Sequence, residues 1–394
     1  MNTPVKTPVK ILVIGGGMSG LTYGILCARN NLDVTVCEQN ARVGKKLSQT
    51  GNGKCNLGNL RLTPDCYNTS AIATAVTQSV TLDDYLNFLI SCGIYTHIDD
   101  QGRIYPITDS ASAVVDCLRH TFAASGGKLQ TDTQISAVTH NSGGKFTVTD
   151  TQGNAAIYDS VVLACGSGSS CLAPEIQGIV PQSYFTALLP SLVPVKVANA
   201  AKALDGIRAR ATVTLQADGK AIATESGEVQ FKDYGLSGIC IFNLSAHIAR
   251  NTVLGQKHNY VFSVDLAPDF SQSQLSSILA RRICNSTPTD QLFTGILRNK
   301  LAECVMERTQ QPTADNLAHT AKNLQFSFSK LLDFSKSQVT AGGIADQYVD
   351  VHTLTLKNGI VALGEVLNVD GLCGGYNLYF AAASAIYAFR HRPT

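Results

Sequence analysis

The sequence lacks the features that mark several large functional classes. Charged residues make up only 15% of the 394 residues, and the formal net charge is +2. This balance leaves no basic surface of the kind that binds nucleic acid or an anionic membrane. Pro, Gly or polar residues interrupt the apolar stretches well short of the length of a membrane span. We therefore expect a soluble, cytoplasmic protein with neither nucleic-acid nor membrane partners.

Cysteine spacings typical of disulfide or metal chemistry are missing as well. The 12 cysteines are scattered without a C-x-x-C pair, and no H-E-x-x-H motif occurs. The apolar stretch after Lys10 has the charged start of a signal peptide, but five glycines between Gly15 and Gly24 interrupt it. We expect reduced thiols and no bound metal.

A strand-helix-strand unit is predicted near the start of the chain. The apolar run Val9–Ile14 is typical of a buried strand, Leu21–Asn30 has helical apolar spacing, and Val34–Cys37 is a second strand. This order is typical of a doubly wound α/β sheet. The pattern further predicts one helix and three strands, at Ser110–Ala124, Thr133–Val138, Lys145–Thr149 and Ser160–Ala164.

The pattern of polar and apolar residues changes from about residue 190. Alternating polar and apolar residues predict antiparallel strands, and two stretches with helical spacing follow them. The expected strands are Val193–Val197, Arg208–Gln216, Lys220–Phe231 and Tyr260–Leu266, and the expected helical stretches are Gln272–Cys284 and Asp290–Arg308. From Ser335 the chain returns to a buried strand (Gly359–Leu363) and a closing helix (Leu378–Arg390).

This order predicts a dinucleotide-binding domain with an insertion. The first domain comprises residues 1–189 and 335–394, and the inserted domain comprises residues 190–334. The inserted domain is expected to be β-rich at about 190–268 and 324–334, with a helical piece at about 270–323. The predicted fold class is therefore α/β, a Rossmann-like two-dinucleotide-binding domain interrupted by an antiparallel-β and helical domain.

A glycine-rich turn lies between the first strand and the first helix. Gly15-x-Gly17-x-x-Gly20 permits a tight turn and a close approach of the backbone to a pyrophosphate at the helix N-terminus. Glycine turns of this kind also occur without a ligand, so the context decides. Glu38 ends the second strand, where a carboxylate can accept hydrogen bonds from ribose hydroxyls and disfavours the 2′-phosphate of NADP. FAD and NAD both remain compatible with these residues.

The loop that follows Glu38 favours FAD over NAD. It runs from Arg42 through Lys45, Lys46 and Leu47 into the stretch Thr50–Asn56. A long basic, glycine-rich loop can supply backbone N–H groups and lysine charge along a pyrophosphate toward a flavin ring. The alternative is an ordinary surface loop with solvated lysines.

The run Ile11–Asn59 resembles the bacterial family of aminoacetone oxidase-like, or BaiN (RdsA)-type, NAD(P)/FAD-dependent oxidoreductases. Further segments resemble motifs of that family in the expected order, at Gly102–Pro106, Tyr234–Gly238, Val339–Gly343, Gly364–Gly371 and Cys373–Asn377. The resemblance implies that Glu38 binds ribose and that the backbone of Ile135 faces the adenine. It also implies that Gly364, Glu365 and Asp370 lie by the ribityl chain and pyrophosphate.

The same resemblance places the start of the last helix beneath the isoalloxazine, where a helix N-terminus stabilises the negative charge of the reduced ring. Together, the motifs and the resemblance predict the following cofactor-binding residues: Gly15, Gly17, Met18, Ser19, Gly20, Glu38, Gln39, Lys45, Lys46, Leu47, Gly51, Asn52, Gly53, Cys55, Asn56, Ile135, Ala164, Gly166, Gly364, Glu365, Asp370, Gly375, Tyr376 and Asn377. No catalytic side chain is assigned, because the flavin N5 would carry the chemistry.

The sequence departs from the family pattern in places. Residues 167–189 lack the Gly-Ser-Thr-Gly-Asp-Gly-Tyr-like run expected there, Lys54 stands in place of Arg, and Ile239 in place of Pro. Cys55 and Cys373 flank the flavin motifs, but they do not form a closely spaced pair. Packing is therefore favoured over a redox role for these two cysteines.

The predicted function is FAD-dependent hydride transfer to or from a small organic substrate. Gly166-Ser167-Gly168 is an incomplete second glycine motif, so NADH or NADPH would act as a transient donor without a domain of its own. Amine oxidation and NAD(P)H-dependent enone reduction both remain open. The alternatives are a tRNA-modifying flavoprotein and a non-catalytic flavin sensor, and the sequence sets no oligomeric state.

Overall fold

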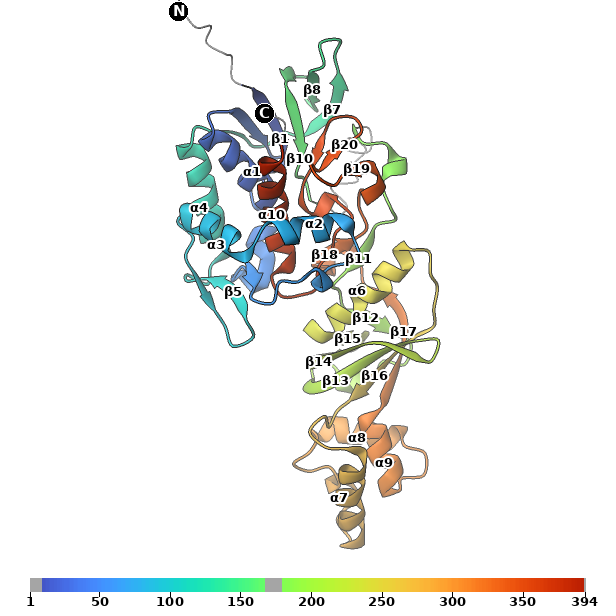
Figure 1. Cartoon of the computed structure of the whole chain (residues 1–394). Helices are drawn as coiled ribbons and strands as arrows, with labels where there is room; N and C mark the ends of the chain where they lie inside the picture. The colour runs from blue at the N-terminus through green and yellow to red at the C-terminus, as the bar shows by residue number, and fades with distance from the viewer. Residues whose placement is uncertain (1–8, 167–178, 393–394) are drawn as a thin grey trace, which may run out of the picture. The chain divides into compact units, whose positions relative to one another are not determined.

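The computed structural model describes residues 9–166 and 179–392, apart from the side chains at positions 49, 51 and 52. The chain forms two compact units, which are treated separately (Figure 1). Unit 1 comprises Met1–Leu189 and Val339–Thr394, and unit 2 comprises Pro190–Gln338. Strands β11 (Leu189–Ser191) and β18 (Val339–Ala341) lie where the chain passes from one unit to the other.

A seven-stranded sheet forms the centre of unit 1. Its strand order is β19-β20-β21-β10-β1-β2-β6. The strands, in that order, are Val349–Asp350, Thr355–Leu356, Val361–Ala362, Ser160–Leu163, Lys10–Ile14, Asp33–Cys37 and Lys128–Gln130. The five strands from β21 to β6 run parallel. This arrangement confirms the predicted α/β class.

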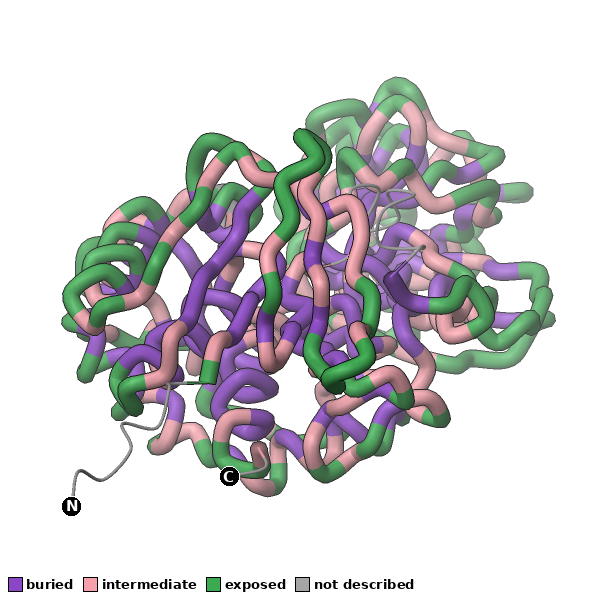
Figure 2. Tube along the Cα trace, turned by 90° about the horizontal axis from the view of Figure 1, so that it is seen from above, coloured by how far each residue is buried: buried purple, intermediate pink, exposed green. Residues whose placement is uncertain are grey.

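The central strands are apolar because their side chains are buried on both faces of the parallel sheet. In β1 the four residues Ile11–Ile14 are all buried, and Figure 2 shows the buried parts of the chain in purple. Helix α1 (Met18–Arg29) packs against α4 (Ala111–Ala124) and α10 (Tyr376–Arg390). Helix α1 is apolar nearly all round its circumference because it is enclosed in this way.

Two further helices of unit 1 were not predicted from the sequence: α2 (Ala71–Ser79) and α3 (Leu82–Ser91). Ser70 caps α2 by accepting a hydrogen bond from the backbone N–H of Ala73. Thr81 and Asp84 form a reciprocal capping box at the start of α3. The Thr-x-x-Asp spacing was the signal in the sequence that could have revealed α3.

Two small three-stranded antiparallel sheets complete unit 1. The first has the order β3-β5-β4, with strands Gly58–Asn59, Arg103–Pro106 and Thr96–Ile98. The second has the order β7-β8-β9, with strands Ile135–His140, Phe146–Asp150 and Ala155–Tyr158. Short 3-10 helices η1 (Leu47–Gly53) and η8 (Gly364–Val366) follow β2 and β21 along the chain.

Unit 2 is built on a closed barrel with the order β12-β15-β14-β13-β16-β17. The strands, in that order, are Val195–Val197, Gly235–Ser237, Lys220–Lys232, Arg208–Ala217, Tyr260–Asp265 and Leu324–Leu331. Helix α6 (Ile239–Val253), which was not predicted, packs on β14. Strand β15 pairs with only the last three residues of β14, Gln230–Lys232.

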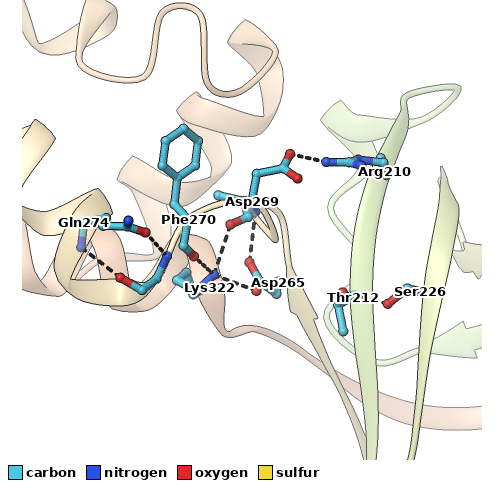
Figure 3. Close-up of polar contacts among 10 residues, drawn as sticks. Arg210, Thr212, Ser226, Asp265, Asp269, Phe270, Gln274 and Lys322 are labelled. Atoms are coloured by element: carbon cyan, nitrogen blue, oxygen red, sulfur yellow. Dashed lines mark hydrogen bonds and ion pairs between the residues drawn. The ribbon is translucent and has the colours of Figure 1, made fainter.

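The helical part of unit 2 contains α7 (Gln272–Cys284), α8 (Asn299–Arg308) and α9 (Ala314–Lys322). The prediction of helix throughout Asp290–Arg308 was wrong. A 3-10 turn at Thr289–Gln291 is separated from α8 by Gly295, whose φ of +79° ends helical geometry. Lys322 holds the turn before α7 by donating to the Asp265 carboxylate (2.7 Å) and to the Ala267 carbonyl (3.0 Å) (Figure 3).

An ion pair ties the last helix of unit 1 to the start of α3. Arg390 Nη2 donates to Asp84 Oδ1 at 2.6 Å, and the backbone N–H of Thr81 donates to Asp84 Oδ2 at 3.0 Å. The Arg390 hydrogen bond and then the Thr81 N–H hold the pKa of Asp84 well below its ordinary value. Asp84 therefore stabilises the fold above the ordinary carboxyl pKa of about 3.9 and loses this effect as the pH falls through its lower folded pKa.

We expect Asp84→Asn to lower the unfolding free energy of unit 1 by about 1 kcal/mol at neutral pH, because the ion pair with Arg390 and the negative charge in the first turn of α3 are lost. The difference between variant and parent should shrink toward pH 2, because the carboxyl of the unfolded parent is then protonated whereas the folded carboxyl still resists protonation. Urea unfolding followed by circular dichroism at both pH values measures it. Asp83→Asn, at the neighbouring exposed position, is the control. An equal loss in both variants would contradict the assignment.

Within the ranges 9–166 and 179–392, no helix combines the length and apolarity needed to cross a lipid bilayer.

Candidate functional site

The glycine turn after β1 is built by backbone contacts that exclude a side chain. A Cβ atom on Gly20 would lie 1.9 Å from the Gly15 carbonyl oxygen, and one on Gly15 would lie 2.5 Å from the Ala164 carbonyl oxygen. Gly15 also has a φ of +109°, a conformation that side chains disfavour. Helix α1 therefore crosses the ends of β1 and β10 at a distance that only glycine permits.

Gly17 differs from its neighbours, because no described atom lies within 4 Å of a Cβ placed on it. It is the N-cap of α1, and no side chain of the described residues caps the helix there. The first turn also contains no acidic residue. The N–H groups and the positive end of the helix dipole are thus left for an anion, and the space beside Gly17 allows one to approach. This end of α1 fits a dinucleotide pyrophosphate.

Glu38 lies beside this turn at the end of β2. Its buried carboxylate accepts hydrogen bonds from the backbone N–H of Gly16 (3.0 Å) and of Asn40 (2.9 Å). The Glu38 backbone bonds to Gln130 and Thr133, which lead into β7 and Ile135. Glu38 therefore supports the glycine turn and also has remaining acceptor capacity for a ribose hydroxyl.

The basic loop after Glu38 meets the C-terminal motif. Lys46 Nζ lies 2.7 Å from Glu365 Oε1 and 2.5 Å from Glu365 Oε2. Glu365 Oε1 also accepts the backbone N–H of Thr340 at 3.0 Å. The preceding Gly364 packs against α1, since a Cβ on Gly364 would lie 3.0 Å from Ser19 Oγ. Two segments that are remote in sequence thus converge at the N-terminus of α1.

A second convergence occurs at the start of α10. Gly375 is the left-handed N-cap of α10, and a Cβ on it would lie 2.4 Å from the Gly58 carbonyl oxygen and 2.5 Å from Asn56 Oδ1. Asn59 Nδ2 donates to the Gly374 carbonyl at 3.2 Å. The loop predicted to approach the flavin ring and the glycine pair predicted to lie beneath that ring are therefore in contact.

Other predicted residues form hydrogen bonds that hold the segment before α10 and the start of that helix. The Asn377 side chain accepts from the Gly371 N–H at 2.8 Å and donates to the Gly371 carbonyl at 3.0 Å. Asp370 is buried, and its carbonyl accepts the N–H of Asn68. Tyr67 donates from its hydroxyl to the Tyr376 carbonyl at 2.9 Å. Tyr67 and Asn68 were missed, because nothing in their local sequence marks them.

The remaining predicted residues surround the same region or lie at its edge. Leu47 is buried, whereas Gln39 and Lys45 are exposed and Lys45 Nζ lies 3.3 Å from Asn40 Oδ1. Gly166 lies close to the carboxylate of Glu365, since a Cβ atom placed on Gly166 would be 3.9 Å from Glu365 Oε2.

Comparison with known proteins identifies the family. The description "HI0933-like protein Rossmann domain" matches residues 9–391. The chain belongs to the HI0933-like family. It is 31% identical to the 3-dehydro-bile acid delta(4,6)-reductase of Clostridium scindens over 97% of this chain and 98% of that protein. It is 25% identical to the ribosomal RNA dihydrouridine synthase of Haemophilus influenzae over 95% of this chain and 96% of that protein.

Among solved structures, the chain is similar to 3-ketosteroid-delta4-(5alpha)-dehydrogenase of Rhodococcus jostii. The two share 14% identity over 99% of this chain and 97% of that chain, with a TM-score of 0.42. The family match and the C. scindens relative confirm the predicted family and the Rossmann-type, FAD-binding fold class. They also confirm the prediction of an FAD-dependent oxidoreductase.

In this HI0933-like chain, Cys55 is fully buried with a φ of +62°. Burial raises the pKa of its thiol to about 11, so the thiol is protonated at neutral pH. Because the thiolate is the reactive form, this environment favours packing over redox chemistry. Cys373 is half-buried.

Some expectations for this family member fall outside the described residues. They are the incomplete second glycine motif at Ser167 and Gly168, most of the atypical segment 167–189, and the surroundings of Gly51 and Asn52 beyond their backbone. Gly53 has a φ of +87° and closes the 3-10 turn that contains them.

Proposed function

We propose that the chain binds one FAD along the glycine turn of unit 1 and transfers hydride between the flavin and a small organic substrate. The observation that carries this proposal is the double convergence in unit 1. At the first convergence Lys46 and Glu365 meet beside the glycine turn, and at the second the flavin loop meets Gly375. In FAD a central pyrophosphate joins the adenosine to the flavin half, so one site at a helix N-terminus and a second site near the ring match the molecule.

Several of the predicted residues have a physical role in this arrangement. The N-terminus of α1 neutralises the pyrophosphate, and Glu38 accepts from the ribose hydroxyls of the adenosine. The backbone at Gly375 and Tyr376 offers a helix N-terminus to the edge of the ring, where it favours negative charge. When bound, the flavin supplies hydride transfer at N5.

Reduction of a conjugated ketone is the reaction best supported. The C. scindens relative is named for reduction at delta(4,6) of a 3-dehydro-bile acid, and it aligns over nearly the whole chain. This name favours enone reduction over the amine oxidation that the sequence left open. NADH or NADPH would then act as a transient donor, in keeping with the single complete glycine motif.

Anaerobic spectroscopy tests both halves of the proposal. The purified protein should show the visible spectrum of bound flavin, and NADH or NADPH should bleach it. A steroid with a conjugated 3-ketone should restore the colour by taking the electrons. Bleaching by small amines but not by nicotinamides would favour amine oxidation. A colourless protein that takes up no added FAD would contradict the proposal. Bound FAD that shows no turnover with any pair of electron donor and acceptor would indicate a flavin sensor.

An RNA substrate is the alternative hypothesis. Relatives from H. influenzae and Escherichia coli, at 25% and 24% identity, are named ribosomal RNA dihydrouridine synthases. The near-neutral net charge of +2 speaks against a large phosphate-binding surface here. Titration with ribosomal RNA and with tRNA at two salt concentrations distinguishes the readings. Tight binding that weakens steeply with salt would favour an RNA substrate.

Replacing Glu38 should weaken flavin retention. We expect Glu38→Ala to raise the dissociation constant for FAD roughly tenfold to a hundredfold, because hydrogen bonds to a carboxylate contribute about 1.5–3 kcal/mol. Dialysis followed by the visible spectrum measures the loss. Asp33→Asn is the control, since Asp33 lies at the other end of β2 and pairs with Lys128. A variant that stays fully yellow after extensive dialysis would show that the ribose assignment is wrong.

A further inference from the structure

The ion pair between Lys46 and Glu365 joins residues that are 319 positions apart. Lys46 belongs to the loop that follows β2, and Glu365 belongs to η8, which follows β21. The carboxylate is fixed, because it also accepts the Thr340 N–H and its side chain is only 18% exposed. The lysine side chain is 51% exposed and reaches the carboxylate from the surface.

The strand order places this contact beyond the ends of the central strands. Strands β21, β10, β1 and β2 are consecutive neighbours and run parallel. Their carboxyl ends therefore lie along one edge of the sheet. A link from the segment after β21 to the loop after β2 must cross the ends of β10 and β1, a span of roughly 14 Å at about 4.8 Å per strand.

The ends of β10 and β1 are the places where a dinucleotide approaches a sheet of this type. Gly15 and Ala164 lie there, directly after β1 and β10. Gly166 is also close to Glu365, since a Cβ placed on it would lie 3.9 Å from Glu365 Oε2. The ion pair thus bridges the same stretch of backbone that the glycine turn opens to a ligand.

We propose that Lys46 and Glu365 form a clasp over the dinucleotide site at the ends of β10 and β1, which closes over bound FAD and slows its release. This inference rests on the proposed function. Glu365 is the fixed half of the clasp, and Lys46 is the half that opens, because it alone has an exposed and flexible side chain. Flavin exchange requires the ion pair to separate, whereas the glycine turn itself stays in place.

Release rates of FAD test the clasp. The variants are Lys46→Gln, Glu365→Gln and the double variant, and the readout is the rise in fluorescence as FAD leaves the diluted holoprotein. We expect each single variant to release FAD roughly threefold to tenfold faster, as the loss of a partly exposed ion pair allows. The double variant should be no faster than the singles, because each single change already removes the same contact.

Two further measurements separate the clasp from a direct contact with flavin. Added salt should accelerate release from the parent more than from Lys46→Gln, because salt screens the ion pair. In FAD-free protein, amide hydrogen exchange in residues 44–48 should rise in Glu365→Gln. Lys128→Gln is the matched control, since Lys128 forms an ion pair of similar exposure with Asp33 at the start of β2, and it should leave both readouts unchanged.

The outcomes are distinct. A parent protein that takes up no FAD would contradict both the proposed function and the clasp. A parent that binds FAD, but whose Lys46→Gln variant releases it at an unchanged rate, would overturn the clasp alone. Effects that multiply in the double variant would also overturn it, because Lys46 and Glu365 would then act separately.

Discussion

Gly20→Ala is expected to lower the unfolding free energy of unit 1 by about 3 kcal/mol, whereas Gly17→Ala should lower it by less than about 1 kcal/mol. The new methyl group on residue 20 would lie 1.9 Å from the Gly15 carbonyl oxygen, a backbone atom that cannot rotate away. Helix α1 would have to move off β1 and β10. At Gly17, in contrast, the φ of −84° suits alanine, and a methyl group meets no described atom within 4 Å.

The two variants should nevertheless both lose flavin. In Gly20→Ala the turn itself is displaced. In Gly17→Ala the fold remains, but the methyl group fills the space through which a pyrophosphate would reach the N–H groups of α1, so we expect at least a roughly tenfold weaker affinity. Urea unfolding and titration of FAD-free protein with FAD measure the two effects. A Gly17→Ala protein that binds FAD as tightly as the parent would contradict the placement of the pyrophosphate.

Gly375→Ala is expected to separate the start of α10 from the flavin loop. Alanine at a φ of +96° costs about 1–2 kcal/mol. The methyl group would also lie 2.4 Å from the Gly58 carbonyl oxygen, and such crowding adds roughly 1–3 kcal/mol. We therefore expect a total loss of about 3 kcal/mol in unfolding free energy and protein that is largely colourless after purification.

Gly126→Ala isolates the cost of the backbone conformation alone. Gly126 lies in unit 1, has a φ of +88°, is exposed, and has no described atom within 4 Å of a Cβ placed on it. We expect it to lose only about 1 kcal/mol and to keep its flavin. If Gly126→Ala and Gly375→Ala lost equal stability, the contact between Gly375 and Gly58 would have no energetic role.

The parts of the fold that were predicted well have a strong local signal. The first strand, helix and second strand were expected at Val9–Ile14, Leu21–Asn30 and Val34–Cys37, and they occur within a few residues of those positions. The helix at Gln272–Cys284 was predicted from its helical spacing with its observed ends, and in the structure Ser271 and Gln274 form a capping box at its start. The spacing of apolar residues and the capping of a helix depend on neighbouring residues alone.

Helix α3 was missed although its capping box is visible in the sequence, whereas two other missed regions have a weak or an interrupted local signal. Helix α6 begins after Gly238, which has no capping side chain among the described residues, so its sequence carries no start signal. Asp290–Arg308 contains enough apolar residues to suggest one helix, but Gly295 divides it. In both regions, packing against the barrel or against other helices sets the structure rather than propensity.

The sequence by itself determined the fold class, the glycine turn and the position of Glu38, because backbone freedom and strand periodicity are properties of adjacent residues. Tertiary structure alone decided that Lys46 meets Glu365, that Gly375 packs on Gly58, and that the strands of unit 2 close into a barrel. These contacts depend on the order in which strands pair across the sheet. Hydrophobic period does not encode that order, so only the folded chain could bring these segments together.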